Sequence, residues 1–374
     1  MSKNSFDLPA ITPLSGSRYN TLRKTVTGRK IEGPFRKRMR ATKLVSMLTS
    51  PMMAIEEVKN RNKVEAYNFE EAPVFILGHW RSGTTHLHNL MCRDKQFGYV
   101  TTYQGVFPNF LLSFQWLFKS TMGMMMPKKR ATDNVELAVD FPQEEEFAIG
   151  NMSPHSFYNF WSFPQNTIEY CDKYLKFDTI SDAEFVEWKK TYLKLAKKAM
   201  LNTGGKRFIS KNPPHTSRVK ELLQIFPNAK FVYIYRNPFT VFESTLNFFM
   251  GTIPSLKFQK ISEDEMKRNI LHVYKEVIGK YEAEKSMIPE GNLIELSFEE
   301  LEADNMATLE KVYKRLGLSD FEKAKPEFEA YIGKQKNYKK NAYQYKQETL
   351  DLVKEHWGFA LDLYGYTTDS NAQL

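Results

Sequence analysis

The chain has 374 residues, of which 42% are hydrophobic and 26% are charged, a globular composition that excludes a disordered, collagen-like or coiled-coil protein. Its two cysteines, Cys92 and Cys171, are too few for a disulfide framework or a Cys/His zinc cluster, and they indicate a reducing compartment. The net charge of +9 favours anionic partners such as nucleotides, sulfate or phosphate esters or an anionic membrane; because no recognition motif accompanies the charge, we expect no nucleic acid.

The sequence shows no targeting or membrane-spanning segment. The N-terminal stretch MSKNSFDLPAITPLSGS lacks the apolar core of a signal peptide, so we expect a cytoplasmic protein. The longest apolar run, residues 106–118, has 13 residues, fewer than the roughly 18 that a spanning helix needs. This run either lies on a membrane surface or lines an apolar cavity.

Apolar runs and helical patterns alternate along the chain. Residues 1–35 are rich in proline, glycine and basic side chains and predict loops, and a helix interrupted near Pro51 is expected over 36–66. Short apolar runs predict buried strands at 73–77, 207–211, 230–235 and 292–297. Helices are expected at 84–92 and from Ser181, which forms a capping box with Glu184, to Gly204-Gly205. Three more are expected: one from a cap at Thr216 or Ser217 to about 226, one that begins at Asn237-Pro238, and one that follows the strand at 292–297 and ends at 316.

Strands that alternate with helices predict an α/β fold with a central parallel sheet flanked by helices, a three-layer P-loop-like architecture with helical and irregular insertions. We expect one domain over residues 1–374, divided into a basic helical extension (1–71), a nucleotide-binding core (72–317) with an aromatic-rich insertion (about 103–165), and a C-terminal helical lid (318–374). Ligands bind such sheets at the carboxyl ends of the strands. This rule selects three loops, at residues 78–85, 210–215 and 236–244.

The first of these loops, Gly78-His-Trp-Arg-Ser-Gly83-Thr-Thr, has the two-glycine spacing of a phosphate-binding loop. Glycines let backbone N–H groups turn toward an anion, and the following helix adds partial positive charge. Thr84 stands where a nucleoside triphosphatase has the lysine that serves the β- and γ-phosphates. We therefore expect a donor without a γ-phosphate, with Arg81 clamping an oxyanion. A plain strand–turn–helix is the simpler alternative.

The other two loops carry cations at strand ends. Arg236 follows one strand directly and Ser244 lies in the next helix, an arginine and hydroxyl pair suited to a phosphate. Lys211 ends the preceding strand, where an ammonium group can neutralise charge on a leaving group. Solvated side chains are the simpler alternative, and His215 is interpreted as a turn or cap residue.

Taken together, the three loops resemble the sulfotransferase family, whose members transfer a sulfuryl group from 3′-phosphoadenosine 5′-phosphosulfate (PAPS) to a hydroxyl or amine. Residues 73–89 are similar to the family's 5′-phosphosulfate loop, in a form found in tyrosylprotein sulfotransferases and bacterial members. Residues 208–248 are similar to its lysine strand and 3′-phosphate site, and residues 293–301 to a later strand–helix element. The resemblance covers about residues 72–317.

The resemblance implies roles for the donor site. The 5′-phosphosulfate would be held by Arg81, Ser82, Gly83, Thr84 and Thr85, with Arg81 also acting in catalysis. Arg236 and Ser244 would hold the 3′-phosphate, and Lys211 would stabilise the bridging oxygen as its bond to sulfur breaks.

Two further positions concern the nucleotide. Phe298 stands where many relatives have a tyrosine near the adenine, so a ring contact would be kept without the hydroxyl. A basic C-terminal segment usually closes over the nucleotide in the family. The candidate here is residues 334–341, with Lys339 and Lys340.

Transfer to an alcohol requires a general base. The strongest candidate is the acidic segment 140–146, which is similar to the Pro-x-Glu segment of bacterial relatives, and we favour Glu144 or Glu145 over the histidines His79, His86 and His88. Crowded carboxylates raise the pKa of one of them, although an acidic helix start stabilised by the helix dipole is an equal alternative. PAPS has no β- or γ-phosphate to bridge, so no metal is expected.

We expect the acceptor to be a bulky apolar alcohol such as a sterol or lipid. Aromatic and methionine side chains that suit an adaptable apolar pocket occur at Phe107, Phe110, Phe114, Trp116, Phe118, Met122–Met126, Phe157, Tyr158, Phe160 and Trp161. Ordinary core packing competes with this interpretation. The basic segment 36–66 is a candidate for docking on the inner membrane surface, and a homodimer is also compatible with the sequence.

Two other functions compete with sulfuryl transfer. A P-loop kinase or NTPase would need a lysine beside the loop and ligands for Mg²⁺, and Thr84 argues against it. A non-catalytic nucleotide-binding protein of the membrane surface is the second alternative. The presence of Lys211 and of the acidic segment argues against it.

Overall fold

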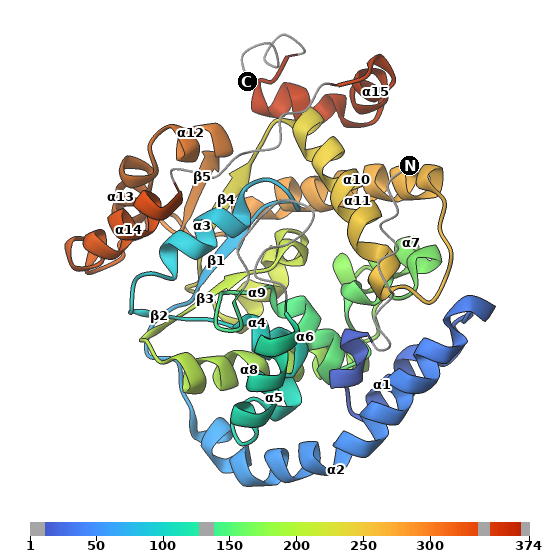
Figure 1. Ribbon diagram of the computed structural model, residues 1–374. Helices are drawn as coiled ribbons and strands as arrows, with labels where there is room; N and C mark the ends of the chain where they lie inside the picture. Colours follow the sequence, from blue (N-terminus) through green and yellow to red (C-terminus); the bar gives the residue numbers. More distant parts are fainter. Residues whose placement is uncertain (1–11, 127–137, 336–344, 368–374) are drawn as a thin grey trace.

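The computed structural model describes residues 12–126, 138–335 and 345–367 (Figure 1). Its five strands are β1 (Val74–Leu77), β2 (Phe97–Gly98), β3 (Arg207–Lys211), β4 (Lys230–Tyr235) and β5 (Leu293–Ser297). All neighbours in the order β2-β3-β1-β4-β5 pair in parallel. The α/β fold with a parallel sheet is therefore confirmed. Sequence analysis missed β2, whose two residues are too short for an apolar run.

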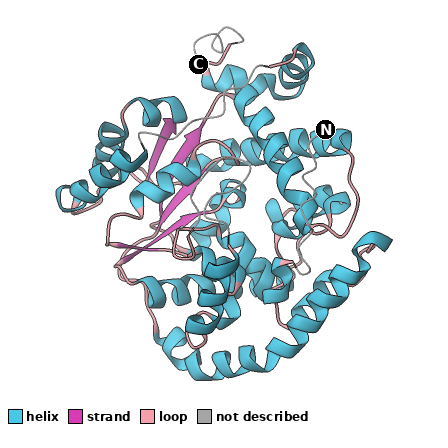
Figure 2. Cartoon of the chain, in the orientation of Figure 1, coloured by secondary structure: helices cyan, strands magenta, loops and turns pink. Residues whose placement is uncertain are grey.

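Side chains of the sheet alternate between two hydrophobic layers. In β1, Val74 and Ile76 pack into one layer and Phe75 and Leu77 into the other. Helices cover both sides of the strands (Figure 2). The Val74 layer contains side chains of α3 (Thr84–Met91), α12 (Phe298–Ala303), α13 (Asn305–Leu316) and α14 (Phe321–Gln335). The Phe75 layer contains side chains of α8 (Asp182–Thr203), α9 (Val219–Ile225), α10 (Pro238–Leu256), α11 (Glu263–Glu284) and α15 (Gln347–Tyr364).

The N-terminal extension contains more helix than the sequence predicted. The expected loop holds η1 (Pro13–Gly16), α1 (Tyr19–Val26) and η2 (Gly33–Phe35), because Leu22, Thr25 and Val26 make one buried face. The predicted interruption near Pro51 is also wrong. Helix α2 runs without a break from Arg36 to Ala66. Pro51 lies inside this helix with its side chain exposed.

The predicted insertion consists of short helices. They are α4 (Thr102–Val106), η3 (Pro108–Phe110), α5 (Gln115–Met125), α6 (Glu145–Met152), η4 (Phe157–Trp161), η5 (Pro164–Asn166), α7 (Thr167–Tyr170) and the π-helical η6 (Cys171–Leu175). Two further turns, η7 (Pro213–Ser217) and η8 (Lys285–Met287), precede α9 and β5.

The predicted helix starts were right in two cases and wrong in a third. Ser181 caps α8 in a capping box, and the Asn237 side chain caps α10. Helix α9 begins instead after Arg218, with no side-chain cap. Thr216 is drawn to the donor loop, where its hydroxyl accepts the Gly78 N–H at 2.8 Å. In the described part of the chain no helix combines the length and apolar character needed to cross a membrane.

Candidate active site

The first loop has the backbone shape of an anion cradle between β1 and α3. Gly78, Arg81 and Gly83 all have positive φ, at 143°, 70° and 94°. A Cβ on Gly78 would lie 2.4 Å from the Ile234 carbonyl oxygen, and one on Gly83 would lie 2.2 Å from the Phe298 ring. Close approach therefore requires both glycines. Gly83 is also the N-cap of α3, so the loop meets the positive end of a helix dipole.

The structure brings together four predicted donor-site residues from the first loop, the end of β4, α10 and the start of α12. Arg81 Nε donates to Ser244 Oγ of α10 at 2.9 Å. The Arg236 guanidinium, at the end of β4, lies 4.2 Å from the Phe298 ring centroid, and burial lowers the pKa of Arg236. Two guanidinium groups, a hydroxyl and a ring thus surround one loop, as an anionic nucleotide requires.

The remaining predicted donor-site residues lie in the loop or outside the described residues. Ser82 and Thr84 are buried in the loop and at the start of α3, and Thr85 is half-buried one position further on. The Ser82 N–H donates to the His79 carbonyl oxygen at 3.2 Å. Lys339 and Lys340, the expected lid residues, lie outside the described residues.

Lys211 and Glu144 form an ion pair at the carboxyl edge of the sheet. Lys211 ends β3, and its Nζ lies 2.6 Å from Glu144 Oε1. Glu144 is the N-cap residue of α6, and its side chain is 16% exposed. Its second oxygen, Oε2, accepts the Tyr158 hydroxyl, which itself accepts the Trp80 Nε1–H at 2.8 Å. A chain of polar contacts therefore runs from the donor loop through Tyr158 and Glu144 to Lys211.

Glu145, the other predicted base, is fully buried behind this pair. Its Oε2 accepts the Ser210 hydroxyl at 2.9 Å, and its Oε1 has no hydrogen-bond partner among the described residues. Burial raises the pKa of Glu145 from 4.5 to about 8, so the carboxyl is largely protonated at neutral pH. The three consecutive glutamates thus have different surroundings, because successive helical residues point about 100° apart.

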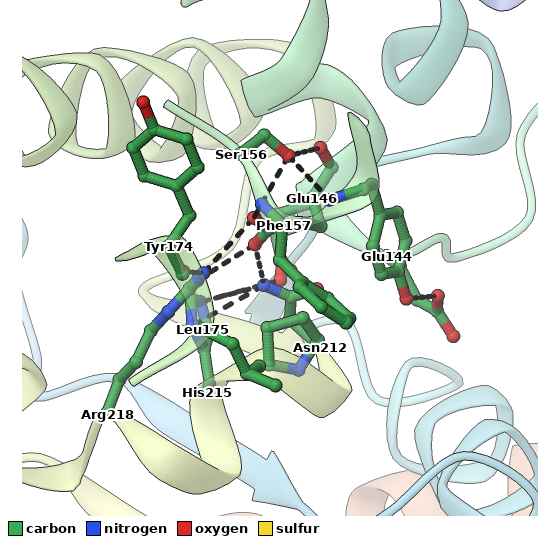
Figure 3. A network of polar contacts seen from close by, with 12 residues as sticks. Glu144, Glu146, Ser156, Phe157, Tyr174, Leu175, Asn212, His215 and Arg218 are labelled. Carbon is green, nitrogen blue, oxygen red and sulfur yellow. Dashed lines mark hydrogen bonds and ion pairs between the residues drawn. The ribbon is translucent and has the colours of Figure 1, made fainter. Parts of the chain in front are cut away.

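Glu146 anchors the helix that carries Glu144. Arg218 contacts both of its carboxylate oxygens, at 2.8 and 3.2 Å, and both side chains are fully buried. Asn212 Nδ2, the Ser156 hydroxyl and the Phe157 N–H donate to the same carboxylate. Figure 3 shows these donors converging on Glu146 while Glu144 points away from them. Arg218 was missed by sequence analysis because it carries no local motif.

Three histidines near the site, His79, His88 and His215, are buried and neutral. Burial lowers the pKa of His79 to about 3, and its Nδ1 lies 2.9 Å from the Trp80 carbonyl oxygen. Burial also lowers the pKa of His88 and of His215 well below the usual value. His86 Nε2 contacts Asn305 Oδ1 at 2.6 Å. These surroundings fit the preference for a carboxylate base.

The aromatic residues of the insertion divide between core and surface. Phe157, Phe160 and Trp161 are buried in the Phe75 layer, beside two cavities of about 10 and 30 Å³. Neither volume accommodates more than about one or two water molecules. Trp116, in contrast, is 72% exposed on α5. Core packing therefore accounts for much of the predicted aromatic pocket.

One group of side chains elsewhere has metal-ligand chemistry. The ligand atoms of Cys171, Asp172 and His272 lie within 4.8 Å of one another. Asp172 already pairs with Lys176 at 3.1 Å, and burial raises the pKa of the Cys171 thiol. A neutral thiol and a carboxylate occupied by an ammonium are poor metal ligands.

Comparison with known proteins defines the class. Residues 73–323 match the sulfotransferase family. The chain is 31% identical over 322 residues to the ω-hydroxy-β-dihydromenaquinone-9 sulfotransferase Stf3 of Mycobacterium bovis and Mycobacterium tuberculosis, covering 86% of this chain and 82% of the relative. Crystal structures of STF9 from Mycobacterium avium and STF1 from M. tuberculosis share its fold. The first has a TM-score of 0.71 at 15% identity over 91% of this chain and 88% of the other; the second has 0.66 at 17% identity over 94% of both.

The chain therefore belongs to the sulfotransferase family and is a sulfotransferase. Family membership implies binding of PAPS and of its product, adenosine 3′,5′-bisphosphate. The identification decides against a kinase and against a non-catalytic nucleotide-binding protein.

Proposed function

We propose that the chain transfers the sulfuryl group of PAPS to the hydroxyl of an apolar, lipid-like alcohol, with Glu144 as the general base. The observation that carries this proposal is the Lys211–Glu144 pair, 2.6 Å apart at the strand edge and linked through Tyr158 to the donor loop. In this pair Lys211 would serve the leaving group and Glu144 the incoming hydroxyl.

The donor residues fit PAPS because they offer cations, a hydroxyl and backbone N–H groups for its two anionic ends. PAPS supplies the sulfuryl group and leaves as adenosine 3′,5′-bisphosphate. Arg236 and Ser244 would hold the 3′-phosphate, while Arg81 and the backbone of the glycine loop would hold the 5′-phosphosulfate. The Phe298 ring, packed between Gly83 and Arg236, offers a flat apolar surface to the adenine.

The chain's residues then divide the chemical work. Lys211 neutralises the charge that develops on the bridging oxygen. Glu144 accepts the proton of the acceptor hydroxyl, which makes the oxygen nucleophilic. In the structure each satisfies the other, so a bound donor would share Lys211 and loosen its hold on Glu144. Tyr158 holds Glu144 at its second oxygen and is a positioning residue.

The lipid-like acceptor is supported by the relative Stf3, whose name gives an ω-hydroxylated dihydromenaquinone as its acceptor. It is also supported by the exposed apolar side chains of the insertion, such as Trp116.

The proposal is tested by product analysis. The protein is incubated with PAPS and a panel of alcohols: a hydroxylated polyprenyl quinone, a sterol, a simple phenol and a sugar. Mass spectrometry should find the sulfate ester of a polyprenyl or sterol alcohol. Sulfation confined to the sugar or the phenol would contradict the lipid-like acceptor. Thermal unfolding with adenosine 3′,5′-bisphosphate at 100 times its Kd should show about 2.7 kcal/mol of stabilisation, lost in Arg236→Ala.

A further inference from the structure

Helix α2 has a second apolar face, which points to solvent. Its buried face includes Thr42, Ser46, Met53 and Glu56. Two positions after each of these, about 200° around the helix, stands an exposed aliphatic residue: Leu44, Leu48, Ile55 and Val58, exposed by 52, 65, 56 and 75%. A surface helix normally carries polar side chains opposite its core face. The packing of the described residues therefore gives no explanation for this stripe.

The charges of α2 lie at its two ends. Residues 44–55 contain no charged side chain over about 18 Å of helix. Before them come exposed basic residues at Arg36, Lys37 and Arg40. After them come exposed basic residues at Lys59, Arg61 and Lys63 and one exposed acidic residue, Glu65. The other two glutamates of this end are paired within the chain, Glu56 with Lys198 and Glu57 with Lys194. An apolar centre between two cationic ends is the pattern of a helix that lies in the surface of an anionic bilayer.

Helix α5 lies beside the second half of α2 (Figure 1). It adds further exposed apolar side chains. Asn60 Nδ2 donates to Ser113 Oγ at 2.8 Å, and Glu56 accepts the N–H groups of Leu112 and Ser113, just before α5 begins. Trp116 and Met124 of α5 are 72% and 81% exposed. Exposed tryptophan is typical of the interface between lipid and water.

We propose that this outer face of α2, together with α5, docks the protein on an anionic lipid surface. The surface rests on its own residues; its purpose, the delivery of a lipid alcohol to Glu144, rests on the proposed function. Only a short stretch of chain separates this surface from the segment that carries Glu144. Residues 100–103 pair with the segment before Glu144 through the Thr102 N–H to Phe141 O and Gln143 N–H to Val100 O hydrogen bonds, each 2.8 Å.

Charge favours a lipid surface over a second copy of the chain. Both ends of the stripe are basic, so two stripes packed together would bring like charges together in either the parallel or the antiparallel arrangement. An anionic headgroup layer complements both ends at once.

The test is flotation of the full-length protein with vesicles. Wild-type protein should bind vesicles of phosphatidylcholine with 30% phosphatidylglycerol. Its binding should be weaker in high salt and weaker on vesicles of pure phosphatidylcholine. The variant Leu48→Gln/Ile55→Gln/Val58→Gln should bind about tenfold more weakly or worse. Two control variants replace exposed side chains elsewhere on the protein. Val186→Gln/Met287→Gln is the control for the apolar variant. Lys323→Gln/Lys325→Gln is the control for the basic variant Arg36→Gln/Lys37→Gln/Arg40→Gln. Both controls should bind as wild type does.

Three results would overturn the docking surface. The first is that the wild type does not bind the anionic vesicles, and the second is that the triple apolar variant binds them as well as the wild type does. The third is that the wild type sediments as a dimer and the same variant as a monomer, while vesicle binding is unchanged. Activity separates this proposal from the previous one. The docking surface is supported if the triple apolar variant no longer turns over an alcohol carried in vesicles but still turns over a dissolved short-chain alcohol at the wild-type rate. Normal vesicle binding by a protein that sulfates neither alcohol supports the surface and contradicts the proposed function.

Discussion

The donor side and the acceptor side of the site are built in different ways. On the donor side, Gly78, Gly83, Lys211 and Arg236 all stand within one or two residues of a strand or helix end, so the sheet itself brings them together. On the acceptor side, Glu144 is placed by contacts between segments far apart in sequence: Lys211, Tyr158 and the buried Glu146–Arg218 pair under its helix. The comparison teaches that the donor site follows from local backbone, whereas the base depends on tertiary packing.

The sharpest test of the acceptor side separates two neighbouring carboxylates. Glu144→Gln should lower kcat by about 10²–10⁴, because the proton acceptor is lost, and should leave the Kd for adenosine 3′,5′-bisphosphate nearly unchanged. Glu145→Gln is the matched control, since it makes the same change one residue away in a fully buried place. Its kcat should fall far less. The reverse order of the two variants would assign the base to Glu145.

The buried ion pair between Arg218 and Glu146 should contribute to the stability of the protein. Arg218→Met leaves the Glu146 carboxylate buried without its cation, and the free energy of unfolding in urea should fall by about 3–5 kcal/mol. Arg218→Met/Glu146→Gln should recover part of this loss because no charge is left unpaired. Lys311→Met, which breaks an ion pair with Glu300 at the surface, should change stability by less than about 1 kcal/mol. Equal effects of the two single variants would show that the buried pair is no anchor.

On the donor side, backbone shape alone should matter. Gly83→Ala puts a Cβ into the Phe298 ring at a positive φ, so we expect a loss of about 1–3 kcal/mol in stability and weaker binding of adenosine 3′,5′-bisphosphate. Gly279→Ala, in open space on α11, should instead be neutral or stabilise by about 0.5–1 kcal/mol. Unchanged nucleotide binding in Gly83→Ala would argue against the cradle.

The last expected effect is a pH dependence of stability. Between pH 4.5 and about 8 the folded protein keeps a proton on Glu145 that the unfolded chain has lost, so raising the pH through this window removes stability. The slope is at most about 1.4 kcal/mol per pH unit. Urea titrations should show that Glu145→Gln flattens this decline, whereas Glu329→Gln, on the exposed side of α14, does not. A wild-type decline that survives in Glu145→Gln would place the titration elsewhere.

These differences explain which features of the fold and of the site could be predicted from the sequence. The parallel sheet and the donor loops were predictable because apolar strands, glycine spacing and strand-end cations are local patterns. The run Glu144–Glu146 was recognisable as a candidate base, but its three members could not be told apart, since their partners are 10 to 72 residues away. Arg218 and Trp80 gave no signal for the same reason. Pro51 misled because a proline disfavours a helix interior without always ending the helix, and α2 continues past it.

The measurement that tests the account most directly is a double-mutant cycle on kcat with Lys211→Ala, Glu144→Gln and the double variant. Because the two side chains form one pair at the reacting edge, the account predicts strong coupling, with the double variant only slightly slower than the slower single variant. Losses that simply add in free energy would mean that Lys211 and Glu144 act independently, and would contradict the shared site.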